Sequence, residues 1–221
     1  MEIKQLKIDN QVIEYQLNIK RIKKCYLKIV SGKIIVNAPL DFPIKTIEKL
    51  ILDHKEIVLK QISTYVPKFN YINNGYVYIF NHQYQIILKD INEHKAVIHK
   101  NKVYVYHHKI QETIENELKN ILYDYLTKQI YYYLDTKFNL VMPKIEIKKF
   151  KSRWGACFSN QNKVSFNLAL VHLNKSLIDY VIIHELCHFI QPNHSKSFYQ
   201  EVDKRLPDYK IREKKLKEIG I

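Results

Sequence analysis

The chain has little of several residue types that would place it in a specialised class of protein. Its 221 residues include only four Gly, six Pro and three Cys, and no stretch approaches the roughly 18 consecutive apolar residues that span a membrane. The shortage of Gly and Pro excludes collagen-like and low-complexity chains, and an apolar content of 46% excludes a disordered tail. The chain is therefore a folded protein, large enough to form its core without a structural metal or a disulfide.

The few cysteines indicate where the protein works. Cys25, Cys157 and Cys187 are far apart, odd in number, and form no C-x-x-C pair. This pattern is typical of free thiols in a reducing compartment. Residues 1–4 already carry charges and lead into no apolar stretch of the kind found in a signal peptide. We therefore expect a cytoplasmic protein with no membrane association, and the sequence leaves its oligomeric state open.

Arginine is scarce for so basic a chain. Only four of the 36 basic residues are Arg, while the 22 acidic residues leave a formal net charge of +14. Arginine is the residue favoured for bidentate contacts with phosphates and bases, and the excess of Lys is spread over both halves of the chain. Composition thus favours a solvated lysine surface over a dedicated nucleic-acid interface, with nucleic acid kept as a weaker alternative partner.

Hydrophobic periodicity predicts an α+β fold in two parts, with a boundary where the composition changes near residues 108–112. Residues 1–110 form a β-rich part with one helix, which begins near Pro43 and ends before Pro67. Residues 111–221 form a helical and β part that opens with a long helix, about Gln111 to Asp135. Its other expected elements are strands at 144–150 and 164–167, an irregular segment at 151–157, and helices at 177–190, 197–206 and 210–217.

The motif H-E-x-x-H at His184, Glu185 and His188 is the most informative feature of the sequence. It falls inside the helix expected at 177–190, for which Ser176 is the expected N-cap. Residues four apart lie on the same face of a helix, so His184 and His188 can bind one metal ion while Glu185 lies beside its open coordination position. Because this helix is apolar nearly all round, three polar side chains in it are costly unless they are paired or bound to metal.

A third ligand is expected downstream of the motif. His194 follows His188 by six residues, just past Pro192, and would complete three ligands plus a water, the arrangement of catalytic zinc. Glu201 and Glu213 are alternative third ligands, and His194 is favoured over both. The same offset occurs in metzincins, but Gln191 stands where they need Gly and both Met residues lie upstream, so the sequence disfavours a metzincin.

The wider sequence resembles the YgjP-type zinc metallopeptidases, which are related to the WLM and SprT groups. The resemblance is carried by H-E-L-C-H at 184–188 and by the segments N-H-S at 193–195, F-Y at 198–199 and L-P-D at 206–208. Upstream, S-R-W-G-A-C at 152–157 is similar to the family's S-R-W-G-S-C, with Ala156 in place of Ser. Phe166 stands where Leu is usual before Asn167. The resemblance extends over nearly the whole chain.

This resemblance implies a zincin-like catalytic domain in the second half of the chain. One Zn²⁺ ion would be held by His184, His188 and His194, with Glu185 as general base. The protein would then be a zinc metallopeptidase, a hydrolase that acts on the peptide bonds of a peptide or protein. The family's natural substrates are poorly defined, so the resemblance leaves the substrate and the cleavage preference open.

Other residues are expected to contact the substrate. Arg153, His172 and Tyr199 are candidates to stabilise the oxyanion that forms during hydrolysis. The strand at 164–167, which includes Asn167, could pair with an extended peptide by β-addition. Two other functions compete with this one. A metal-dependent nuclease with three His at the same spacing would suit the positive charge but would lack Glu185, and a nucleic-acid-associated protease would act on DNA-bound proteins.

Overall fold

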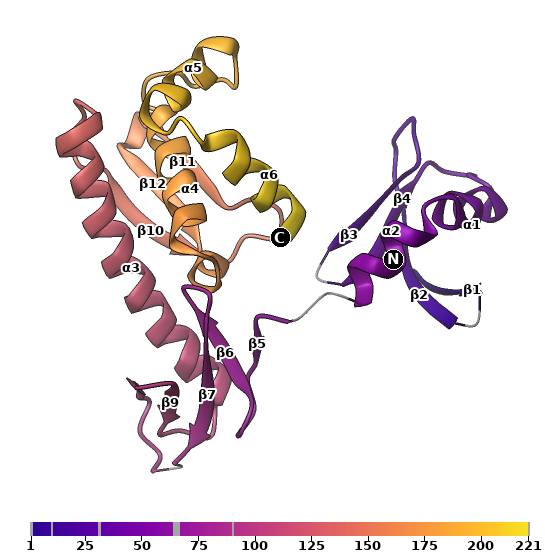
Figure 1. Ribbon diagram of the computed structural model, residues 1–221, viewed down its shortest axis with the longest axis horizontal. Coiled ribbons are helices and arrows are strands. Elements are labelled where there is room, and N and C mark those ends of the chain that lie inside the picture. Colours follow the sequence, from indigo (N-terminus) through magenta and orange to yellow (C-terminus); the bar gives the residue numbers. More distant parts are fainter. Residues whose placement is uncertain (1, 10, 31, 64–66, 90, 221) are drawn as a thin grey trace. The chain divides into compact units, whose positions relative to one another are not determined.

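The computed structural model describes the chain except residues 1, 10, 31, 64–66, 90 and 221, and it has the predicted mixed α+β architecture (Figure 1). Contacts divide the chain into two compact units, residues 1–67 and 68–219. Among the described residues, no helix has the length and apolar character that crossing a bilayer requires. The three cysteines are free thiols.

In the described part of the first unit, one mixed sheet packs with two helices. Its elements are β1 (Glu2–Ile8), β2 (Gln11–Ile19), β3 (Tyr26–Val30), β4 (Lys33–Ala38), α1 (Ile44–Asp53) and α2 (Lys55–Ser63). The strand order is β1-β2-β4-β3, and Ile47, Ile51 and Val58 of the helices share a buried core with strand residues such as Tyr15. The single helix expected up to Pro67 is therefore wrong. The helix breaks at His54, whose Nδ1 lies 2.9 Å from the carbonyl oxygen of Leu50.

The second unit begins with another mixed sheet, which has the order β5-β6-β7-β9-β8. Its strands are β5 (Phe69–Asn70), β6 (Tyr76–Ile79), β7 (His82–Leu88), β8 (Ala96–His99) and β9 (Lys102–Val105). The set β6-β7-β9-β8 repeats the pairing of β1-β2-β4-β3. In both, two antiparallel hairpins are joined through a central parallel pair. This likeness has no counterpart in the sequence pattern.

The sheet of β5 to β9 belongs to the same unit as the helices that follow it. Val77, Ile86 and Val103 of this sheet lie in one core with Ile114 and Leu118 of helix α3 (Ile110–Lys137). The boundary between the two compact units thus falls between residues 67 and 68 of the chain, whereas composition predicts a boundary near residue 110. Packing explains the difference, because a small sheet buries one apolar face only when a helix covers it.

The remaining elements form a second layer of sheet and helices along α3 (Figure 1). They are β10 (Lys144–Lys148), β11 (Gly155–Phe158), β12 (Lys163–Asn167), α4 (Lys175–Cys187), α5 (Lys196–Arg205) and α6 (Tyr209–Ile219), with short 3₁₀ turns at Ser159–Gln161 and Leu168–His172. Helix α4 contacts β11, α3, α5 and α6. This explains why it is apolar on nearly every face.

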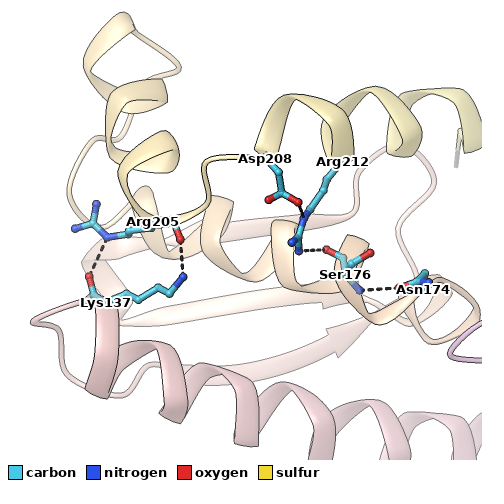
Figure 2. A network of polar contacts seen from close by, with 6 residues as sticks. All are labelled: Lys137, Asn174, Ser176, Arg205, Asp208 and Arg212. Carbon is cyan, nitrogen blue, oxygen red and sulfur yellow. Dashed lines mark hydrogen bonds and ion pairs between the residues drawn. The ribbon is translucent and has the colours of Figure 1, made fainter.

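Two polar contacts tie these helices together at their ends (Figure 2). The Nζ of Lys137, at the end of α3, donates to the carbonyl oxygen of Arg205 at 2.6 Å, and Nε of Arg205 donates to the carbonyl oxygen of Lys137 at 3.1 Å. Each cation therefore caps the C-terminus of the other helix. Elsewhere Arg212 of α6 donates to the carbonyl oxygen of Ser176 at 2.8 Å, which joins α6 to the first turn of α4.

We expect Arg205→Ala to lower the free energy of unfolding by about 1–2 kcal/mol, because the change removes the cap of α3 and the hydrogen bonds that its guanidinium makes. The guanidinium also lies 4.3 Å from the ring centroid of Phe138. Urea denaturation would measure the effect. Lys204→Ala, on the exposed neighbour, is the matched control, and an equal loss in both variants would contradict this role of Arg205.

Candidate metal centre and active site

Helix α4 presents the motif histidines at its C-terminal end. The side chain of Asn174 accepts the backbone N–H of Ser176 and so caps the helix at its N-terminus, which makes the expected Ser176 cap wrong by two residues. The helix ends at Cys187, and His188 is its C-cap with helical backbone angles. The ring centroids of His184 and His188 lie 5.0 Å apart, as expected for residues one turn apart.

His194 returns to this pair from the connection between α4 and α5. Its Nε2 lies 3.0 Å from Nε2 of His184, and its ring centroid lies 4.7 Å from that of His188. One ligand atom from each of the three histidines lies within 4.8 Å of the others. Ser195, the next residue, caps α5 by accepting the N–H of Phe198. The start of α5 therefore determines where His194 lies.

A buried aromatic ring contacts all three imidazoles. Phe198 of α5 is completely buried, and its ring centroid lies 4.9, 4.5 and 4.9 Å from those of His184, His188 and His194. This ring limits the positions that the three imidazoles can adopt and excludes water from the side that it covers. The sequence marks Phe198 only as part of the F-Y segment at 198–199, which predicts no role for it. Its position four residues after His194, on an amphipathic helix, is the feature that could have predicted its contact with the histidines.

Hydrogen bonds outside the cluster orient two of the rings. Nδ1 of His188 lies 3.3 Å from the carbonyl oxygen of Gln191. Since a carbonyl oxygen only accepts, Nδ1 carries the proton and Nε2 keeps its lone pair. The hydroxyl of Tyr180, one turn before His184 on α4, lies 3.5 Å from Nδ1 of His184. Both contacts are of the kind that orients histidine ligands in metal sites.

The electrostatics of the cluster suit a cation. Burial, with help from the neighbouring imidazoles, lowers the pKa of His184 to about 3, and burial also lowers the pKa of His188. Both rings are therefore neutral near pH 7 and can donate lone pairs. Beside them Glu185 is only 6% exposed. Burial raises the pKa of its carboxyl to about 8, and the charge of Arg153 and the N–H of Cys157 oppose that rise.

Three imidazoles and a neighbouring buried carboxyl group form a donor set that zinc fits well. Imidazole nitrogens suit zinc, and three protein ligands leave a fourth position for water. A bound cation would also offset the cost of burying the charge of Glu185. The residues present therefore fit the metal that the sequence predicts.

The alternative third ligands lie in ion pairs of their own. The carboxylate of Glu201 pairs with Arg205, its neighbour one turn along α5. Glu213 pairs with Lys217 on α6, with 2.8 Å between Oε1 and Nζ. Neither belongs to a potential metal cluster among the described residues, whereas His194 does.

Of the four residues predicted to contact substrate, two lie near the site and two are buried in backbone contacts. The ring centroid of Tyr199 lies 6.3 Å from that of His194, and Arg153 is close enough to lower the pKa of Glu185. His172 is buried elsewhere, with Nδ1 2.7 Å from the carbonyl oxygen of Tyr78. Asn167 is also buried, and its amide bonds the backbone of its own unit.

The sheet beside α4 corrects two further predictions. Strand β12 lies between β10 and β11 and is paired on both sides, so the segment 164–167 cannot accept an added peptide strand. The segment 151–157, expected to be irregular, ends in β11, the strand of this sheet at the edge opposite β10. Helix α4 contacts β11. The elements that meet at the site are therefore α4, α5 and this edge strand.

The family comparison agrees with the chemistry of the cluster. Residues 23–219 match the family described as "YgjP-like, metallopeptidase domain". No curated protein matches the chain. Among solved structures, the crystal structure of the metallopeptidase zymogen of Pyrococcus abyssi abylysin is similar at 23% identity, with a TM-score of 0.38, over 41% of this chain and 90% of that one. At this TM-score the likeness does not establish a common fold.

Proposed function

The chain belongs to the YgjP-like metallopeptidase family, and from this premise we propose that it is a zinc-dependent peptidase that uses Glu185 as its general base. The observation that carries the proposal is the convergence of His184, His188 and His194, with the buried Glu185 next to His184 on the same helix. One Zn²⁺ ion held by these histidines would lower the pKa of a water molecule and polarise the carbonyl of the substrate.

The chain's own residues perform the remaining steps of hydrolysis. Glu185 takes a proton from the attacking water and later delivers it to the leaving amine. The low polarity around Glu185 favours this exchange, because burial raises the pKa of its carboxyl and makes protonation during turnover less costly. Tyr199 lies near His194 and Arg153 near Glu185, so these two residues are the proposed contacts of the substrate carbonyl. His172 and Asn167 are not proposed for this role.

Peptide hydrolysis by metal-loaded protein tests the function directly. The purified chain is incubated with a fluorogenic peptide library and, in parallel, with single-stranded RNA. We expect cleavage of peptide, about one zinc per chain, loss of cleavage with a chelator, and recovery when zinc is added back. Cleavage of RNA with no cleavage of peptide would replace the proposal with the nuclease alternative. Absence of stoichiometric metal in the active protein would contradict the zinc assignment.

Tyr180→Phe should weaken zinc binding by about 10-fold while the fold stays intact. The change removes the hydroxyl that contacts Nδ1 of His184, and hydrogen-bond partners of metal ligands typically contribute about 10- to 100-fold to metal affinity. Competition with a chromophoric chelator measures the dissociation constant. Tyr131→Phe, at an exposed position of α3, controls for loss of a tyrosine hydroxyl. Equal affinity in the parent and in Tyr180→Phe would show that the contact does not orient the ligand.

A further inference from the structure

Gly155, the first residue of β11, lies unusually close to the side chain of Glu185. A Cβ atom built on Gly155 would be 2.6 Å from Oε1 of Glu185 and 2.8 Å from both its Cδ and its Cγ. Such distances are well inside van der Waals contact, so a side chain at position 155 and the observed position of Glu185 exclude each other. Gly155 is not among the described residues with positive φ. Glycine is therefore needed here for space and not for backbone conformation.

The neighbouring backbone holds Glu185 in the place that Gly155 leaves open. The N–H of Cys157, two residues further along β11, donates to the carboxylate of Glu185. Residues two apart in a strand share one face, so Gly155 and Cys157 face Glu185 together. Arg153, which precedes the strand, adds electrostatic attraction. The carboxylate is thus packed closely against one end of this strand and hydrogen-bonded to it.

Asn167 fixes the segment that leads into β11. Its Nδ2 donates to the carbonyl oxygens of Phe150 and Arg153, each at 3.0 Å, and its backbone N–H donates to the carbonyl oxygen of Trp154 at 2.8 Å. Asn167 is only 2% exposed, so water does not compete for these bonds. The backbone that approaches Glu185 is therefore held from the neighbouring strand β12, and it would not readily move away from an added side chain.

The geometry points to Gly155 as a positioning residue for Glu185. Its missing side chain leaves the space in which the carboxylate reaches the N–H of Cys157. Any larger residue would push the carboxylate off this strand. The kinetic consequence rests on the proposed function, because it assumes that Glu185 is the general base. The packing consequence does not depend on that function, and the two are tested separately.

A stability cycle tests the packing. Gly155→Ala in the parent chain should lower the melting temperature by several degrees, since a shift of about 2–4 °C accompanies each kcal/mol in a chain of this size. In a Glu185→Ala background, where the crowding atoms are gone, the same change should leave the melting temperature unchanged or raise it, because Ala restricts the unfolded chain more than Gly does. An equal decrease in both backgrounds would overturn the proposal. The result is informative even if the single variant does not fold.

A kinetic cycle tests the effect on Glu185. Gly155→Ala should lower kcat by about 10- to 100-fold, the loss expected when a reacting group is displaced by about 1 Å, with KM and zinc content unchanged. Added to Glu185→Gln, it should cause no further loss. Ala156→Ser, on the opposite face of β11, is the control and should retain parental kcat. Full activity of Gly155→Ala, or an undiminished additional loss in the Glu185→Gln background, would contradict the proposal. If the parent cleaves no peptide, the function fails and the stability cycle alone decides.

Discussion

Glu185→Gln is expected to lower kcat for peptide hydrolysis by about 10²- to 10⁴-fold, the range that general acid–base catalysis contributes. The amide has nearly the same shape as the carboxylate but cannot take a proton from water at neutral pH. Zinc content should stay at one equivalent, because the three histidines that are expected to hold the ion are unchanged. Steady-state kinetics and metal analysis of the same preparation measure both quantities.

Glu201→Gln is the matched control for this experiment. Glu201 is a half-buried glutamate of the same unit, paired with Arg205 on α5, and its neutralisation should leave kcat within a few-fold of the parent. Because burial raises the pKa of the Glu185 carboxyl, keeping this ionisable group in the folded state costs free energy that a neutral amide avoids, so we expect the apo form of Glu185→Gln to be at least as stable as the apo parent. Parental kcat in Glu185→Gln with zinc bound would remove Glu185 from the base role.

The long elements and the cluster of three histidines were predictable because local patterns encode them. The apolar stripe of α3 predicts a helix at 111–135, and the observed helix, Ile110–Lys137, is only slightly longer at each end. Likewise, H-E-x-x-H puts two imidazoles on one helix face whatever surrounds it. His194 could be placed near them because Pro192 stops the helix and few residues separate it from His188. These features could be predicted because the residues that form each of them are close together in the sequence.

The elements that were missed lack such a local signal. Strand β11 has only four residues, and it begins with Gly155 and Ala156, which are poor strand formers. Its pairing with β12 decides its conformation, and that is a tertiary effect. The break between α1 and α2 falls at His54, with no Gly or Pro to mark it. In β11 and at the end of α1, the local residue preferences therefore do not predict the observed backbone conformation.

The surroundings of the metal ligands were hidden for the same reason. Phe198 and Gly155 come from two different elements, and their contacts with the histidines and with Glu185 form only in the folded chain. Asn167 was predicted near the substrate because its strand could pair with an extended peptide, but its amide donates to the backbone before β11. The motif therefore predicted which histidines lie together, but it did not predict the contacts of the residues around them.

His188→Ala is expected to abolish stoichiometric zinc binding and, with it, peptide hydrolysis. Loss of an outer hydrogen-bond partner alone costs 10- to 100-fold in metal affinity, so loss of a ligand should cost on the order of 100-fold or more. The variant also loses the stacked contact with Phe198, whose ring centroid lies 4.5 Å from that of His188. Metal analysis after dialysis against a weak chelator measures the loss. His82→Ala, at an exposed strand position, is the control.

Thermal unfolding separates loss of the metal from loss of the fold. Zinc that binds only the native state stabilises it in proportion to RT ln(1 + [Zn]/Kd), so saturation at about 100 times Kd raises stability by about 2.7 kcal/mol. The parent should therefore melt at a lower temperature after chelation, whereas His188→Ala should melt at the same temperature with and without the chelator. Glu201→Gln should behave as the parent does if His194 completes the site. A melting temperature of His188→Ala that still falls on chelation would mean that a different set of residues holds the zinc. Loss of zinc from Glu201→Gln would assign the third ligand to the Glu201 carboxylate.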